Sequence, residues 1–103
     1  YEKEVPELGQ MLKDTRRNEL PDSWEKSLPK FESVEAKATR AYSGDVINAI
    51  AEKIPQLIGG SADLTPSNNT FIKSSPDLQT GRYEARNIHF GIREHAMGST
   101  MNG

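Results

Sequence analysis

Residues Asn87 to Gly103 read NIHFGIREHAMGSTMNG and form the most informative stretch of the chain. Its first part, Asn87 to Phe90, is rich in β-branched and aromatic residues and predicts a strand that ends before Gly91. A helical pattern follows at once from Glu94 to Asn102. Glu94 therefore lies in the first turn of a helix that directly follows a strand. Enzymes of the α/β class place reacting groups at this position.

Working back along the chain, the pattern from Ala36 to Ile54 predicts the longest helix. Apolar residues recur there at spacings of three and four, which is typical of a helix with one buried face. Thr39, or Ser33 with Ala36 following, is a candidate start, and Pro55 is expected to end the helix. Gln56 to Ile58 then predicts a short apolar strand that runs into the pair Gly59-Gly60.

The segment between the two predicted strands is polar. Thr65 and Pro66 indicate a helix start or a tight turn, because proline is favoured in the first turn of a helix. Asn69 to Arg82 is rich in Ser, Pro, Asp and Gly, a composition typical of a surface loop.

Residues 1–30 are interpreted as a connecting segment between domains. Three prolines interrupt this polar stretch, although Leu8, Met11 and Leu12 have the spacing of one short amphipathic helix. Trp24 and Leu28 lie four residues apart and predict a further helical turn or an anchor on a neighbouring surface.

Length and composition limit what the chain can be. It has 103 residues, of which 34% are hydrophobic, which is lean for a self-sufficient globule of this size. The net charge of -2 gives no electrostatic basis for binding nucleic acid or an anionic membrane. No run of residues is apolar enough to span a bilayer, and the absence of cysteine excludes disulfides and thiolate metal sites.

The order helix, strand, loop, strand, helix predicts part of a parallel α/β sheet. Two short strands cannot make an enclosed sheet. Residues 31–103 are therefore expected to be a piece of a larger α/β domain, and the isolated chain is expected to be poorly folded.

A second motif, GGSADLTPSN, occupies Gly59 to Asn68. It lacks the spacing of a dinucleotide-binding loop and the lysine of a nucleotide-binding P-loop. In structural terms it predicts a strand-to-helix turn in which Asp63 and Ser67 cap backbone amides. A hydroxyl such as that of Ser67 beside free helix amides also suits a phosphate group.

The remaining candidates are an arginine and two histidines. Arg40, in the string KATRAYS, is in general most often a solvated charge, but its planar guanidinium is well suited to binding two phosphate oxygens. His89 and His95 lie on different predicted elements and lack a convincing third ligand, so no metal site is expected.

The strings GIREHAMG, GGSADLTPSN and ATR together resemble transketolase. The resemblance is close from Trp24 to Gly103 and loose before it. It implies the end of the interdomain linker followed by the first half of the pyrimidine-binding domain, a parallel-sheet domain that binds thiamine diphosphate. The implied reaction transfers a two-carbon ketol unit from a ketose phosphate to an aldose phosphate in the pentose phosphate pathway.

The resemblance also implies a catalytic role for Glu94. In the family this glutamate hydrogen-bonds the pyrimidine nitrogen N1′ of thiamine diphosphate. A buried, protonated carboxyl there favours the imino form of the ring, whose N4′ removes the proton from C2. Glutamine in place of Glu94 would keep a hydrogen bond but could not exchange this proton.

Further roles follow from the same resemblance. It implies that Asp63 and Leu64 lie at the cofactor and that Arg40 and Ser67 bind the substrate phosphate. The divalent cation, Mg or Ca, is expected in the family's other, diphosphate-binding domain. The implied active unit is a homodimer with Glu94 buried at the subunit interface, in the cytoplasm or in a plastid.

Two alternatives remain open at this point. Dihydroxyacetone synthase shares both motifs and is distinguished by substrate-binding residues further along the chain. A non-catalytic α/β module that binds a partner through Trp24 and Leu28 is the alternative from a different class.

Overall fold

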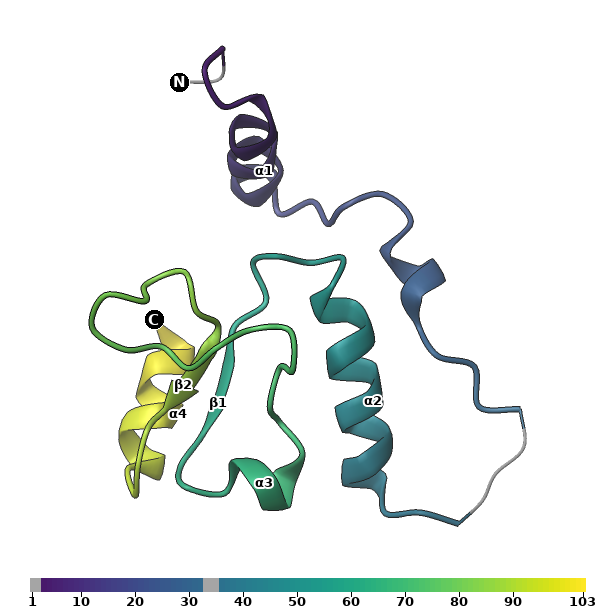
Figure 1. Ribbon diagram of the computed structural model, residues 1–103, viewed down its shortest axis with the longest axis vertical. Helices are drawn as coiled ribbons and strands as arrows, with labels where there is room; N and C mark the ends of the chain where they lie inside the picture. The colour runs from purple at the N-terminus through teal and green to yellow at the C-terminus, as the bar shows by residue number, and fades with distance from the viewer. Residues whose placement is uncertain (1–2, 33–35) are drawn as a thin grey trace.

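A computed structural model describes residues 3–32 and 36–103. The described elements, in chain order, are helix α1 (Pro6–Arg17), a 3-10 turn η1 (Trp24–Ser27), helix α2 (Thr39–Ala51), strand β1 (Gly59–Ser61), helix α3 (Thr65–Asn68), strand β2 (Asn87–His89) and helix α4 (Glu94–Asn102). Figure 1 shows α2 beside the β1–α3 unit, with α1 at the opposite end of the molecule from α3. Within these residues no helix is long and apolar enough to cross a membrane.

The sheet is parallel, which confirms the predicted α/β class. Strands β1 and β2 pair in the register Gly59↔Asn87, Gly60↔Ile88 and Ser61↔His89. The pairing requires glycine at position 60, because a Cβ there would collide with the carbonyl oxygen of Ile88 and would lie 2.8 Å from Cε2 of Phe90. This close approach brings the backbones of the two motifs together.

The first predicted strand was misplaced. Gln56 to Ile58 is not a strand, because Leu57 closes a turn by donating its N–H to the Ile54 carbonyl at 3.1 Å. Strand β1 instead begins at Gly59, whose N–H donates to the Arg86 carbonyl at 2.9 Å. Apolar character therefore marked the approach to the sheet, whereas the two glycines form the strand itself.

Helix α2 is shorter than the predicted span from Ala36 to Ile54. It begins at Thr39, one of the two candidate starts, because Ala38 is extended with φ -60° and ψ 141°. The other candidate, Ser33, lies outside the described residues. It ends at Ala51, before Pro55 is reached. A residue that precedes proline is disfavoured in helical conformation, which keeps Ile54 outside the regular helix.

Three other predictions are confirmed. Helix α4 has the predicted bounds, α3 begins at Thr65 with proline in its first turn, and residues 69–82 contain no regular helix or strand. Within the described residues the buried hydrophobic side chains are those of Ile72 and three alanines, Ala51, Ala62 and Ala85. They lie where α2 and the loop meet the sheet, so the core fixes the two strands relative to α2.

Candidate functional site

Both motifs leave the sheet at the same edge. Because β1 and β2 are parallel and in register, their carboxyl ends at Ser61 and His89 lie side by side. The chain after β1 carries Asp63, Leu64 and Ser67, and the chain after β2 carries Glu94. Residues from two distant stretches of sequence are thus brought to one edge (Figure 1).

Helix α2 begins at this same edge. Figure 1 shows the start of α2 and the whole of α3 at one end of the molecule. The two helices touch, because a Cβ on Gly44 would lie 2.9 Å from the carbonyl oxygen of Asn69. Arg40 lies one turn before Gly44, and Ser67 lies two residues before Asn69. The fold therefore places Arg40 and Ser67 on adjoining elements, which sequence spacing alone did not indicate.

The turn after β1 is held by Ser61. Its buried Oγ accepts hydrogen bonds from the Leu64 N–H at 3.3 Å and from Nδ2 of Asn68 at 3.4 Å. Asp63, between Ser61 and Leu64, has a left-handed backbone with φ 66°. The expectation that Asp63 and Ser67 cap the amides was wrong, because α3 has Leu64 at its N-cap and no side-chain cap.

The predicted site side chains are exposed. Arg40, Asp63, Ser67 and Glu94 all face solvent, and none has a hydrogen-bond or ion-pair partner within the described part of the chain. Leu64 presents apolar surface among them, with 53% of its area exposed. Because these polar side chains make no hydrogen bond or ion pair with the described chain, they are free to bind a ligand. Burial of Glu94 at a subunit interface stays a prediction.

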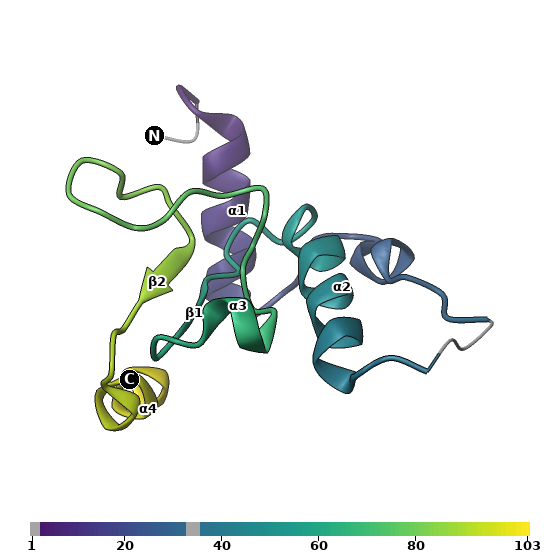
Figure 2. The same cartoon turned by 60° about the horizontal axis from the view of Figure 1, so that its bottom comes forward.

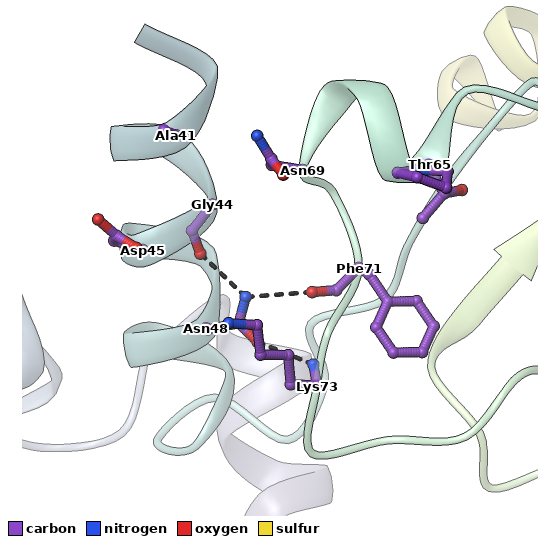
Figure 3. Close-up of a pocket in the computed structure, with 9 residues that line it drawn as sticks. Ala41, Gly44, Asp45, Asn48, Thr65, Asn69, Phe71 and Lys73 are labelled. Atoms are coloured by element: carbon purple, nitrogen blue, oxygen red, sulfur yellow. Dashed lines mark hydrogen bonds between the residues drawn. The ribbon is translucent and has the colours of Figure 1, made fainter. Parts of the chain in front are cut away.

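A small pocket lies between α2 and α3, close to this edge. Its volume is about 200 Å³, and its walls include Ala41, Gly44, Thr65 and Phe71 (Figure 3). Asn48 bridges its two sides, since Nδ2 donates to the carbonyls of Gly44 at 2.9 Å and Phe71 at 3.1 Å. The pocket is thus lined by both helices, and the hydrogen bonds of Asn48 join its two walls.

Sequence reasoning missed three residues that build the site's support, namely Asn48, Arg86 and Asn87. Asn87 is 3% exposed; it accepts from the Ile72 N–H at 2.8 Å and donates to the carbonyls of Ile72 and Ser75 at 2.9 and 2.8 Å. The signal was an asparagine at the head of a short buried strand, where β-propensity disfavours it.

The described residues contain no group of three His, Cys, Asp or Glu side chains placed to hold a metal ion. His89 instead contacts Asp77, with Nε2 2.9 Å from Oδ1. This contact ties the end of β2 to the loop before it.

Comparison with known proteins agrees with the resemblance. The family model for the transketolase pyrimidine-binding domain matches residues 35–103. A transketolase from Geobacillus stearothermophilus is 52% identical over 103 residues, covering 100% of this chain and 15% of that protein. Transketolase 1 from Saccharomyces cerevisiae is 47% identical over 109 residues, covering 100% of this chain and 16% of that protein. The chain thus spans about a sixth of the curated relatives it matches.

Solved structures show the same likeness. A transketolase from Pichia stipitis in complex with sedoheptulose-7-phosphate superposes with a TM-score of 0.91 at 45% identity, over 99% of this chain and 16% of that one. The transketolase of Leishmania mexicana gives a TM-score of 0.90 at 40% identity, over 99% of this chain and 15% of that one. With its parallel strands, its two motif turns and this family match, the chain belongs to the pyrimidine-binding domain family of transketolase.

Proposed function

We propose that this chain is part of a transketolase, an enzyme that uses thiamine diphosphate to transfer a two-carbon ketol unit from a ketose phosphate to an aldose phosphate. The observation that carries the proposal is the edge at which both motif turns emerge. Asp63, Ser67 and Glu94 are presented there without partners in the described chain. The transketolase names of the relatives favour this reaction over that of dihydroxyacetone synthase.

The residues at this edge fit an aminopyrimidine ring. Glu94 supplies a carboxyl that can hold a proton toward the ring nitrogen N1′, and Leu64 supplies apolar surface for the ring. When bound, thiamine diphosphate supplies a nucleophilic carbon at C2 of its thiazolium. The part of Glu94 in our proposal is to exchange a proton with N1′, which a carboxyl can do and an amide cannot. Asp63, beside Leu64, orients the cofactor.

Arg40 and Ser67 would bind the substrate phosphate. The guanidinium of Arg40 can contact two phosphate oxygens at once, and the hydroxyl of Ser67 can donate to a third. Their place on adjoining helices supports this pairing, since α2 and α3 touch at Gly44 and Asn69. Together the two residues favour phosphorylated sugars over free sugars.

The rest of the proposed enzyme lies outside this chain. Residues 1–30 serve as the connecting segment and residues 31–103 as the first part of the pyrimidine-binding domain. A diphosphate-binding domain would hold the divalent cation, Mg or Ca. The exposed Glu94 is expected to meet that domain of a second subunit, so the active unit is a homodimer. We place it in the pentose phosphate pathway, in the cytoplasm or a plastid.

The test is ketol transfer by the full-length protein, with and without thiamine diphosphate, for wild type, Glu94→Gln and the control Glu52→Gln. Glu52 is an exposed glutamate at the C-terminal end of α2. We expect cofactor-dependent transfer that Glu94→Gln reduces at least a hundredfold and Glu52→Gln leaves unchanged. Transfer with formaldehyde as the preferred acceptor would favour dihydroxyacetone synthase, and no transfer would favour the non-catalytic module.

A further inference from the structure

We propose that Arg93 is a positioning residue for Glu94: it closes the turn at the end of β2 and so sets the direction in which α4 presents the glutamate. The inference rests on the proposed function of Glu94. It assigns Arg93 no contact with cofactor or substrate, and it concerns the four residues Phe90 to Arg93 that separate the strand from the helix.

The turn is closed by two hydrogen bonds. The Arg93 N–H donates to the Gly91 carbonyl at 2.8 Å, and the guanidinium Nη1 of Arg93 donates to the Phe90 carbonyl at 3.0 Å. The second bond is charge-assisted and reaches back across the turn to the end of the strand. Arg93 therefore spans the whole connection from β2 to α4.

Gly91 leaves room for this arrangement. Its φ of 64° is left-handed, a conformation that glycine adopts without strain. A Cβ at this position would lie 2.7 Å from Nη1 of Arg93. A side chain at residue 91 would thus both strain the backbone and displace the guanidinium from the Phe90 carbonyl.

The turn is fastened to the other motif through Phe90. The Phe90 N–H donates to the Ser61 carbonyl at 3.3 Å, and the Phe90 ring lies against Gly60. Since Ser61 also holds the Asp63 turn, Arg93 connects Glu94 to the backbone that carries the first motif. The two halves of the proposed site are coupled through these contacts.

Helix α4 has little else to orient it. None of its residues is buried, and its N-cap, Arg93, makes no side-chain cap to the helix. Figure 2 shows α4 beyond the end of β2 and away from α2. The turn is therefore the main restraint that the described chain places on the direction of Glu94.

The test uses the full-length enzyme with Arg93→Met, which keeps the stem but not the donors, and Arg93→Lys, which keeps one charged donor. Arg16→Met on α1 is the control for losing an exposed arginine. We expect Arg93→Met to lower kcat about tenfold with KM for the sugar phosphates unchanged. Amide hydrogen exchange at residues 94–97 of the cofactor-free protein should become several-fold faster. Arg93→Lys should keep kcat and the exchange rate close to their wild-type values, and the control Arg16→Met should change neither kcat nor exchange.

Gly91→Ala provides an independent variant. It should reproduce the fall in kcat and the faster exchange, and combining it with Arg93→Met should cost less than the product of the two single losses. Wild-type kcat or wild-type exchange in Arg93→Met, equal losses in Arg93→Lys and Arg93→Met, or independent losses in the double variant would each overturn the proposal. Absence of ketol transfer in the wild type would instead refute the proposed function, whereas the exchange data would still report on the turn.

Discussion

Two regions of this molecule use their polar side chains in opposite ways. One is the loop from Asn69 to Arg82; the other, called the motif turns, comprises residues 62–67 and 90–94, which follow β1 and β2. In the loop region the polar groups bond to one another and to the backbone. In the motif turns the side chains of Asp63, Ser67 and Glu94 have no partner within the described chain.

The loop is held by three side chains that reach it from regular elements or their ends. Asn48 accepts from the Lys73 N–H at 2.8 Å. Arg86 donates through Nη1 to the Ala51 carbonyl at 2.8 Å and through Nη2 to Ser74 Oγ at 3.2 Å. Together with Asn87, these residues give the loop the hydrogen bonds that a strand or helix would otherwise supply.

This difference in hydrogen bonding separates the residues that stabilise the fold from those available for function. A buried polar group with all its bonds made inside the chain contributes to folding, and its loss leaves unsatisfied partners. An exposed polar group without a partner contributes little to folding and is available to a ligand. Substitutions in the loop supports should therefore change stability, and those in the motif turns should change binding or turnover.

Asn87→Ala is the substitution with the largest expected effect on stability. It removes three donated bonds, to the carbonyls of Ile72, Ser75 and Pro76, and one accepted bond from a buried site, so we expect the full-length protein to lose about 3–4 kcal/mol of unfolding free energy. Urea denaturation measures this loss. Asn102→Ala, which removes an exposed amide at the end of α4, is the matched control, and equal stability of the two variants would contradict the role of Asn87.

Gly60→Ala tests the close approach between the two motifs. The added methyl group would collide with the Ile88 carbonyl and press on the Phe90 ring, and we expect a loss of about 2–3 kcal/mol. Gly98→Ala is the control, because a methyl group there would meet no atom of the described chain within 4 Å and alanine favours a helix. Thermal unfolding compares the two variants. If the Gly60→Ala protein and the Gly98→Ala control have the same Tm, the strands are packed more loosely than described.

Arg40→Ala should affect binding and leave stability unchanged. Loss of a charge-assisted bond to phosphate should raise KM for a ketose phosphate by a factor that corresponds to a lost binding free energy on the order of 1.5–3 kcal/mol. KM for the corresponding free ketose should change little. Steady-state kinetics with both sugars measure the difference, and Arg16→Ala is the control. Equal KM changes for the two sugars would remove Arg40 from the phosphate site.

Helix and strand bounds were predicted most accurately where local sequence signals alone determine them. Helix α4 was placed at its observed bounds, and α3 was placed at Thr65, because proline and an abrupt change of pattern mark these starts. The first strand was placed too early because Leu57 and Ile58 are apolar. The strand pairing depends instead on Gly60, and the need for glycine there is evident only once the Ile88 backbone lies beside it.

The sequence supplied the candidate site residues but not the contacts that hold them in place. Two strings of sequence identified Asp63, Ser67 and Glu94 through their resemblance to a family. Nothing local indicated that Ser61 would hold the Asp63 turn or that Arg93 would bond across Gly91. Such contacts depend on backbone geometry that is set only when the two strands meet.

The most direct test of this account measures two properties of one variant. In full-length Glu94→Gln, C2-proton exchange of bound thiamine diphosphate is followed by NMR, and unfolding free energy is followed by urea denaturation. We expect exchange to fall at least a hundredfold while stability stays within about 0.5 kcal/mol of the wild type. Exchange at the wild-type rate would show that Glu94 is not the activating group and would contradict the assignment of function to the motif turns.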